Sequence, residues 1–448
     1  MRITQAVFTK LFGYFNYEIT LHDTVTIIHG PNGCGKTTML KIMDAVFNKR
    51  ISVLRAIDFE SVKFILSNGV ALSIIRKQYA LNAQGYNSSN FYYLTYVIEA
   101  PGKPDDILGS SERTEEYAVL IERALLSQRP LPYLERLSEE KWFDRRSGRE
   151  YSRDEVINRF GPHIVRRYGN GEPEDVVPEK VQAIIDSIDV RLISADRLTV
   201  QKRVGRQYGE DSLEIMQKVD VIAQDISSRI KDTIQKYAQI SQAKDRTFPL
   251  RAIHNINPMS VEQIKEKLVE LEAKRKEFVE TGLLEETHDI DIHELVDAVM
   301  ESNRNNLSLY AADTEEKLAA LADLSASIKL FRRLIDNSFN HKKIVFNKDK
   351  GFFFVTEYSG LEVNPRDLSS GEQHELVMFY DLIFKTAQNT LVLIDEPELS
   401  LHVGWQIDYV DKLIDIIQIA GFYTLLATHS PQIIHDKWDL AVSLAETN

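Results

Sequence analysis

The sequence predicts an α/β fold: a parallel sheet that carries a phosphate-binding loop, an antiparallel β region, and a mainly helical insertion. Three observations support this prediction. The apolar run at residues 25–28 leads directly into GPNGCGKTT at residues 30–38, and a helical pattern follows. Residues 59–100 read as antiparallel strands. Residues 366–448 read helix, strand, helix, strand, which suits a parallel sheet.

Residues 1–100 are expected to form an N-terminal lobe with the phosphate-binding loop. Short strands are predicted at residues 3–8, 14–21 and 25–28, followed by a helix at residues 37–47. A hairpin is predicted around Asn68-Gly69, because this pair between two apolar runs favours a tight turn.

Residues 101–340 are expected to form a mainly helical insertion. Its first part, to about residue 175, is polar and charged with weak helical periodicity, and residues 190–194 read as a buried strand. From about residue 205 the pattern is mainly helical. One charged helix bounded by Pro258 and Gly282 predicts a short helical arm. Its apolar face is formed by Val261, Ile264, Leu268 and Leu271.

Residues 341–448 are expected to form the C-terminal lobe. A hairpin is predicted at residues 343–346 and 351–357, a helix at residues 372–384, and a buried strand at residues 390–394.

Composition narrows the class of protein. The chain has 448 residues, of which 43% are hydrophobic, so it can bury a sizeable core. No apolar window is long enough to cross a bilayer and no signal peptide is recognised, so a cytoplasmic protein without a membrane partner is expected. The one cysteine, Cys34, excludes an internal disulfide and a zinc site built on several cysteines. The net charge of −13 gives no support for nucleic-acid binding beyond local basic patches.

The loop at residues 30–38 fits the G-x-x-x-x-G-K-[ST] pattern at every constrained position. Its glycines let backbone N–H groups approach phosphate oxygens, and the start of the following helix adds positive potential. Lys36 would reach the terminal phosphates, and the Thr37 hydroxyl would ligate Mg²⁺. The predicted cofactor-binding residues of this loop are Asn32, Gly33, Cys34, Gly35, Lys36, Thr37 and Thr38.

Two carboxylates follow the buried strand at residues 390–394. Asp395 and Glu396 at the tip of such a strand are costly to keep without a cation or a water to use them. Asp395 is expected to hold Mg²⁺, and Glu396 to polarise an attacking water as general base. His429 follows another apolar strand and is predicted to be a second catalytic residue that meets the terminal phosphate.

The third motif is LSSGEQ at residues 368–373, at the start of a predicted helix. A serine there would cap the helix, and the free N–H groups of its first turn would face an anion. By itself the motif predicts only a helix cap; the family resemblance that the three motifs carry together implies that Ser369, Ser370, Gly371 and Glu372 bind the cofactor.

In this order, the phosphate-binding loop, LSSGEQ, LVLIDEPELSLH and ATHSP resemble the ATP-binding-cassette (ABC) ATPases, in particular the soluble branch with the SMC, RecF and OLD-type proteins. The resemblance covers residues 1–100 and 340–435. It implies an ABC-ATPase head in which two copies sandwich ATP and Mg²⁺, with the signature motif of one head facing the phosphate-binding loop of the other. It also implies a D-loop from Glu398 to His402 and makes His429 the switch histidine.

The resemblance further implies a metal-sensing glutamine after an early strand. Gln78 is the preferred residue on order along the fold, and Gln201 is the alternative.

The flanking sequences LSSGEQHELV, IDEPELSLHVGWQ and LLATHSPQII resemble ATPase subunits of bacterial anti-phage systems of the PARIS, Septu and retron-linked types. This implies an oligomeric sensor or scaffold that controls a separate effector protein, often a nuclease. The alternatives are a RecF-like DNA repair or recombination ATPase and an ATP-binding switch module with little turnover. A transporter motor fits the signature less well.

Two other groups of charged residues are best explained without a functional site. The acids of DIDIH, Asp289 and Asp291 with His293, fit the start of a helix better than a metal cluster. Several basic pairs fit scattered surface charge better than a nucleic-acid groove, although they leave a nucleic-acid partner open: Arg145-Arg146, Arg166-Arg167, Lys202-Arg203 with Arg206, and Lys274-Arg275-Lys276.

Overall fold

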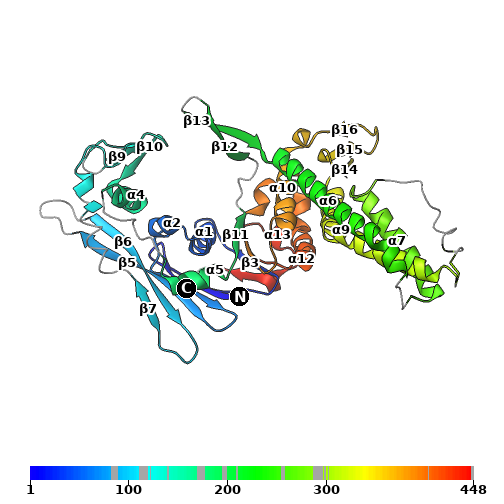
Figure 1. Cartoon of the computed structure of the whole chain (residues 1–448). Helices are drawn as coiled ribbons and strands as arrows, with labels where there is room; N and C mark the ends of the chain where they lie inside the picture. Colours follow the sequence, from blue (N-terminus) through cyan, green and yellow to red (C-terminus); the bar gives the residue numbers. More distant parts are fainter. Residues whose placement is uncertain are drawn as a thin grey trace. The chain divides into compact units, whose positions relative to one another are not determined.

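The fold is described from a computed structural model of the whole chain (Figure 1). The structure describes all residues except 82–88, 110–119, 122, 139–140, 169–176, 194–198, 208–209, 254–257, 286–295, 297–298, 301, 402 and 445–448. The chain divides into two compact units. The first unit comprises Met1–Ala195, Thr386–Leu399 and Gln406–Asn448, and the second comprises Asp196–Lys385 and Ser400–Trp405.

A five-stranded parallel sheet in the first unit has the order β11-β17-β18-β3-β19. Three of its strands are almost continuously apolar and buried, because both faces of a parallel sheet are covered. This confirms the predicted α/β class with a parallel sheet. The strands are β3 (Val25–His29), β11 (Val190–Ile193), β17 (Leu391–Asp395), β18 (Tyr423–Thr428) and β19 (Ala441–Ser443).

A six-stranded antiparallel sheet, in the order β2-β1-β4-β5-β6-β7, also belongs to the first unit. Buried and half-buried residues alternate along β4, as expected where one face packs on a core. The predicted Asn68-Gly69 turn joins β4 to β5, with Gly69 at a φ of 79°. The strands are β1 (Ile3–Leu11), β2 (Phe15–Thr20), β4 (Ser61–Leu66), β5 (Ala71–Leu81), β6 (Ser89–Glu99) and β7 (Asp106–Gly109).

Helix α1 (Lys36–Phe47) joins the two sheets into one core. It packs on β11, β17 and β18 of the parallel sheet. On the antiparallel side, the ring of Phe47 meets Phe64 of β4 edge-on at 5.1 Å. Buried apolar residues of both sheets form one continuous cluster around the helix. Other helices of the first unit include α2 (Ile51–Ala56), α4 (Arg153–Tyr168), α5 (Glu179–Asp186), α12 (Tyr409–Ala420) and α13 (Pro431–Ile434).

A second, smaller core lies around the buried Trp142. Helix α4 covers a three-stranded antiparallel sheet, which was not anticipated because its strands are short and lie in polar, charged sequence without clear alternation. The strands are β8 (Leu134–Arg136), β9 (Lys141–Asp144) and β10 (Arg149–Ser152).

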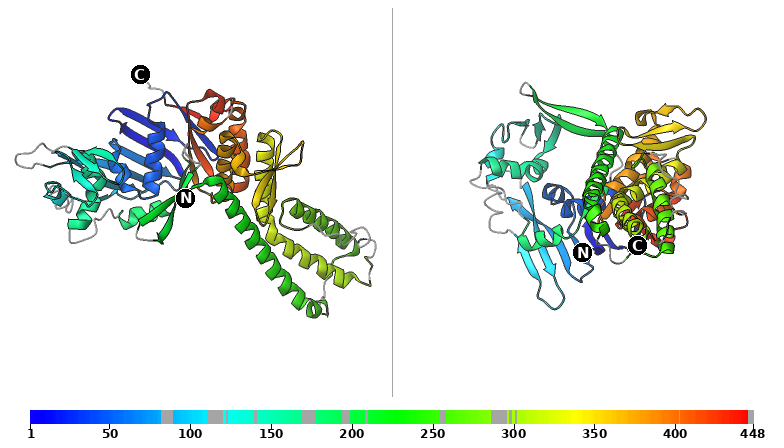
Figure 2. Two further views of the ribbon diagram at one scale, coloured as in Figure 1. Left: turned by 90° about the horizontal axis from the view of Figure 1, so that it is seen from above. Right: turned by 45° about the vertical axis from the view of Figure 1, so that its right-hand side comes forward.

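Three helices dominate the second unit (Figures 1 and 2). They are α6 (Lys218–Ile253), α7 (Val261–Glu280) and α9 (Arg304–Ser338), and α9 packs against both others. The predicted arm helix is α7, which begins at a capping box between Ser260 and Gln263 and buries Ile264, Leu268 and Leu271.

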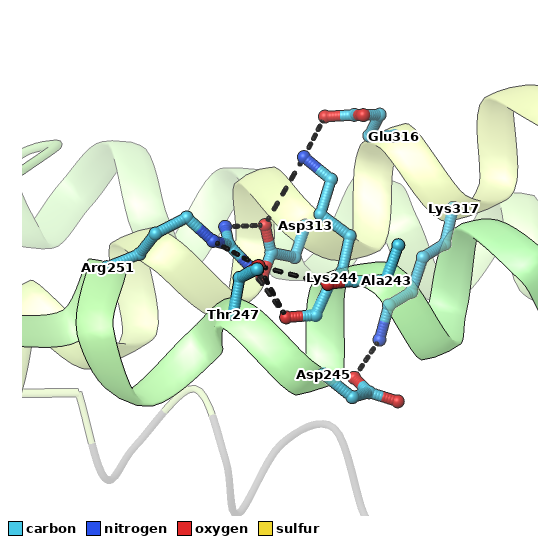
Figure 3. A network of polar contacts seen from close by, with 8 residues as sticks. All are labelled: Ala243, Lys244, Asp245, Thr247, Arg251, Asp313, Glu316 and Lys317. Atoms are coloured by element: carbon cyan, nitrogen blue, oxygen red, sulfur yellow. Dashed lines mark hydrogen bonds and ion pairs between the residues drawn. The ribbon is translucent and has the colours of Figure 1, made fainter.

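Ion pairs fasten α6 to α9 (Figure 3). The guanidinium of Arg251 binds both oxygens of the buried Asp313 carboxylate, with one contact at 2.7 Å. Lys317 and Asp245 form a second ion pair at 2.7 Å, in which α9 supplies the cation and α6 supplies the carboxylate. A bidentate guanidinium–carboxylate pair fixes geometry as well as charge, so the two long helices are held in register.

Helix α10 (Ser370–Phe384) begins at the second LSSGEQ serine, and the first, Ser369, is its N-cap. It packs on α6 and α9 near a three-stranded sheet. The predicted hairpin at residues 343–357 is part of this sheet, whose strands are β14 (Lys342–Asn347), β15 (Gly351–Thr356) and β16 (Glu362–Val363). The hairpin of β12 (Thr199–Gln207) and β13 (Glu210–Gln217) was not anticipated from the helical pattern after residue 205.

The remaining short elements are the helix α11 (Val403–Ile407) and the 3-10 turns η1 (Pro365–Asp367), η2 (Pro397–Ser400) and η3 (Trp438–Leu440). Among the described helices, none combines the length and the apolar character that a membrane span requires.

Candidate functional site

Three strands of the parallel sheet deliver the predicted site residues of the first unit to one edge. Strands β17, β18 and β3 are adjacent and parallel, so their carboxyl ends lie together. The register sets Asp395 beside Ala427, and Thr428 beside His29. The phosphate-binding loop, the pair of acids and His429 therefore start from the same level of the sheet.

The loop after β3 has the conformation that its glycines allow. Gly33 and Gly35 have φ values of 87° and 92°, in the left-handed region that disfavours other residues. A Cβ on Gly35 would also lie 2.7 Å from Cδ2 of Leu11, whereas one on Gly33 would meet nothing within 4 Å. Gly35 is thus required by the packing of the loop, and the exposed Asn32-Gly33 segment leaves room for a ligand to approach the backbone.

Lys36 is buried within the loop that it follows. Its Nζ donates to the carbonyl oxygens of Gly30 at 2.8 Å and Pro31 at 3.0 Å, and lies 3.9 Å from Sγ of the buried Cys34. Burial lowers the pKa of His29, and the nearby ammonium of Lys36 lowers it further. A positive charge is therefore held in the loop beside a histidine that stays neutral.

Helix α1 begins at this loop without a side-chain cap. Its N-cap is Gly35, and its first turn contains no acidic residue. The half-buried Thr37 and Thr38 lie in that first turn. The unpaired N–H groups and the dipole of a helix start favour an anion, so the loop and α1 suit a phosphate group.

Thr37 and Asp395 meet across the site. The Thr37 hydroxyl donates to Oδ1 of Asp395 at 2.9 Å. Burial raises the pKa of Asp395, the hydrogen bond from Thr37 opposes the rise, and the negative charges of Glu396 and Glu398 add to it. Among the described residues, no cluster of three or more His, Cys, Asp and Glu side chains forms a metal cage. A Mg²⁺ ion at this pair would take its other ligands from phosphate and water, as Mg²⁺ commonly does.

Glu396 has an unusual backbone for a residue with a side chain. Its φ is 44°, and its N–H is fixed by the carbonyl oxygen of Ala427 in β18 at 2.9 Å. Non-glycine residues with positive φ persist only where surrounding structure holds them, and they concentrate at functional sites. The half-buried Glu396 is thus held in a set position next to Asp395.

Sequence reasoning missed the partner of His429. Nδ1 of His429 lies 3.0 Å from Oε1 of the buried Glu398, a residue that the sequence predicts only as the start of a D-loop. The signal was weak, because nothing in the local sequence shows that the turn after β17 reaches the end of β18. His402, at the other end of that predicted D-loop, lies outside the described residues.

The LSSGEQ residues lie in the second unit. Ser369 and Ser370 are exposed, and Gly371 is half-buried. Ser369 caps α10 in a capping box with Glu372, whose carboxylate accepts from the Ser369 N–H at 2.9 Å and from Lys342 at 2.7 Å. Burial opposes ionisation of Glu372, but the hydrogen bonds from Lys342 and Ser369 outweigh it and hold its pKa below the ordinary value. Glu372 thus anchors the helix start, while the serines face outward.

For several predicted residues, the structure does not describe the side chain. Gln78 lies on β5 opposite Tyr92, and Gln201 lies on β12 opposite Ile215, but both side chains are outside the described part of the structure. Asp289, Asp291 and His293 also lie outside it. Of the basic pairs, Arg145 binds Glu135 at 2.6 Å, which favours ordinary surface charge at that position.

A family model described as "AAA domain, putative AbiEii toxin, Type IV TA system" matches residues 212–435, which is half of the chain. The chain therefore belongs to this family of AAA-type ATPases. The matched range contains Ser369, Asp395, Glu396 and His429, whereas the phosphate-binding loop precedes it. No relative matches among curated protein sequences.

Solved structures give a looser likeness. An SMC head domain from Thermotoga maritima is 9% identical with a TM-score of 0.34, over 98% of this chain and 92% of that one. An Smc head domain from Pyrococcus furiosus, with an extended coiled coil and bound to the C-terminal domain of ScpA, is 13% identical with a TM-score of 0.30, over 97% and 91% of the two chains. At TM-scores this low, the likeness carries no information about function.

Proposed function

We propose that this protein binds and hydrolyses ATP with Mg²⁺ and that it uses this cycle to control a separate protein. The observation that supports the first part best is the contact between Thr37 and Asp395, at 2.9 Å. A Mg²⁺–nucleotide site needs two ligands from the protein. One is a hydroxyl at the start of the helix after the phosphate-binding loop, and the other is a carboxylate at a strand end.

The neighbouring residues suit this chemistry. Lys36 and the free N–H groups at the start of α1 would bind the phosphates. Together with the metal ion, they would balance the negative charge of the phosphates. Glu396 would accept a proton from the attacking water, because it follows Asp395 directly and its backbone is fixed. His429, at the end of β18, would contact the terminal phosphate.

Two copies of the chain are proposed to complete each site. The exposed Ser369 and Ser370 and the start of α10 would contact the phosphates bound by another copy. Support comes from the exposure of these serines together with the resemblance of LSSGEQ to the ABC signature. The assembly would be a homodimer or a larger homo-oligomer.

The controlled protein is proposed to be an effector, such as a nuclease, in defence against phage. Support comes from the sequences that flank the three motifs, and the family description names a putative toxin of a type IV toxin–antitoxin system. The native mass of the complex purified with the product of the neighbouring gene, with and without ATP, tests this part. A monomer that binds no such partner in either condition would contradict it.

Nucleotide binding and turnover test the first part. Lys36→Ala should weaken nucleotide affinity by removing a charge-assisted contact. Glu396→Gln should keep binding but lower kcat by about a hundredfold or more, the scale of losing a general base. Glu266→Gln, the same chemical change on the exposed face of α7, is the matched control and should do neither. Loss of ATP binding in Glu396→Gln would show that the role given to this residue is wrong.

A further inference from the structure

We infer that Glu398 is a positioning residue: it holds the imidazole of His429 in the tautomer with the proton on Nδ1, so that Nε2 is presented to the ligand. The part of this inference that concerns the use of Nε2 rests on the proposed function. The part that concerns the geometry of Glu398 and His429 does not. The first evidence is convergence on one atom. Oε1 of Glu398 accepts from the Thr428 hydroxyl at 2.7 Å and from the His429 N–H at 2.9 Å, and Nδ1 of His429 lies 3.0 Å from the same oxygen.

The chemistry of the contact decides the tautomer. An ionised carboxylate oxygen only accepts hydrogen bonds. An unprotonated Nδ1 at 3.0 Å from it would set two lone pairs against each other, so a protonated Nδ1 is favoured. In a neutral ring, Nε2 is then the acceptor, and in a charged ring it is a second donor. The side chain of Glu398 is 5% exposed and that of His429 is 41% exposed, so the carboxylate is the buried anchor and the ring reaches outward.

The backbone around the pair is fixed on both sides. The N–H of Glu396 binds the carbonyl oxygen of Ala427, and Glu398 binds the next two residues of the same strand end. The turn after β17 is thus attached to Ala427 and Thr428 of β18 and to His429 directly after it. These contacts tie His429 to the turn that carries Asp395 and Glu396.

The second oxygen of Glu398 argues against a role limited to packing. Oε2 is buried, and among the described residues it has no hydrogen-bond partner. Leaving a carboxylate oxygen buried and unpaired is destabilising, so a residue selected only for stability at this position would be uncharged. The charged residue is explained if its use is to orient the imidazole.

Nitrogen NMR of the histidine rings tests the geometry without any nucleotide. The two ring nitrogens give different signals when protonated and unprotonated, and the His429 signals are assigned by their loss in His429→Gln. We expect the neutral ring of the wild-type protein to carry its proton on Nδ1, and Glu398→Ala to shift it toward Nε2. A wild-type ring protonated on Nε2 would overturn the inference, even if the alanine variant does not fold. An unchanged tautomer in a folded Glu398→Ala would do the same.

Kinetics test the functional consequence. Glu398→Ala should lower kcat by about tenfold to a hundredfold, as losing an orienting partner of a functional imidazole does, with KM nearly unchanged. The effects of Glu398→Ala and His429→Ala should not add in the double variant, because the first acts through the second. Ser430→Ala, which removes a contact to Gln406 but none to Glu398, is the control for disturbance of the strand end. Additive losses would contradict a positioning role.

The NMR experiment and the kinetic experiment test different claims, so one claim can fail without the other. If the wild-type protein hydrolyses no ATP, the proposed function fails, while the ring tautomer still decides the relation between Glu398 and His429. If hydrolysis is confirmed but the proton lies on Nε2, only the inference on Glu398 fails.

Discussion

Thr37 and Asp395 are 358 residues apart in the chain, yet the hydroxyl of one donates to the carboxylate of the other at 2.9 Å. The contact joins the start of α1 to the end of β17, elements that pack directly on each other in the first unit. It brings the two halves of the predicted site together within one unit of the structure.

Asp395→Asn should stabilise the protein and abolish its response to Mg²⁺. A carboxyl group with a raised pKa binds more protons in the folded than in the unfolded state, so its contribution to stability falls as pH rises from 3.8 through the folded pKa. At neutral pH the asparagine should therefore raise Tm, by roughly 2 °C. With nucleotide, Mg²⁺ should raise the Tm of the wild-type protein but not of the variant.

Thermal unfolding at neutral pH, without and with Mg²⁺ and nucleotide, checks this. The exposed Asp105→Asn in the same unit should leave both values unchanged. A lower Tm in Asp395→Asn, or a Mg²⁺ response equal to that of the wild-type protein, would contradict the assignment.

Asp225→Asn should destabilise the second unit in a pH-dependent way. Burial of Asp225 opposes its ionisation, but hydrogen bonds from Lys385, Tyr380 and Arg229 lower its pKa to about 2. A lowered pKa stabilises the folded state above the unfolded value of 3.8, and this stabilisation is lost as pH falls toward 2. It amounts to about 2 kcal/mol.

Denaturant unfolding at a series of pH values measures the difference between the variant and the wild-type protein. That difference should be present at neutral pH and should vanish near pH 2. Asp232→Asn, on the exposed side of the same helix α6, should show no such difference at any pH. A difference that persists undiminished at pH 2 would show that Asp225 stabilises by some means other than its charge.

Gly351→Ala should destabilise far more than Gly360→Ala. Both glycines have positive φ, 73° and 66°, so the backbone strain of an alanine is similar and costs about 1 kcal/mol. A Cβ at Gly351 would lie 1.9 Å from the carbonyl oxygen of Ala223 in α6, whereas one at Gly360 would meet nothing within 4 Å. We expect Gly351→Ala to cost at least about 3 kcal/mol by analogy with severe overpacking.

The comparison of these two variants by thermal or denaturant unfolding isolates the close approach of β15 to α6. Equal losses for the two alanines would mean that backbone strain alone accounts for both.

The sequence predicts features whose cause is local. The apolar runs of β3, β17 and β18 and the glycines of the loop are visible in short windows, and the structure contains the corresponding elements. The contact of Glu398 with His429 was not predictable, because it depends on how β17 and β18 align. The pairing of Lys342 with Glu372 is hidden for the same reason, since strand β14 and the start of α10 meet only in the folded chain.

The β12–β13 hairpin shows a different limit. Its strands lie in a stretch that continues into the long helix α6, and polar residues with few apolar positions give no clear period of two. Here the pairing of the two strands determines the structure. That pairing cannot be recognised from either short stretch of sequence alone.

The central claim is that two copies of this chain complete each other's ATP site, and mixed assembly tests it most directly. Lys36→Ala and Ser369→Arg should each be inactive alone, because the first lacks the phosphate-binding lysine and the second blocks the exposed signature serine. In a co-expressed mixture, half of the dimers are mixed and each has one intact site, so about a quarter of wild-type turnover should return. Mixing Lys36→Ala with the double variant Lys36→Ala/Ser369→Arg should restore nothing. A first mixture as inactive as its components would contradict the account.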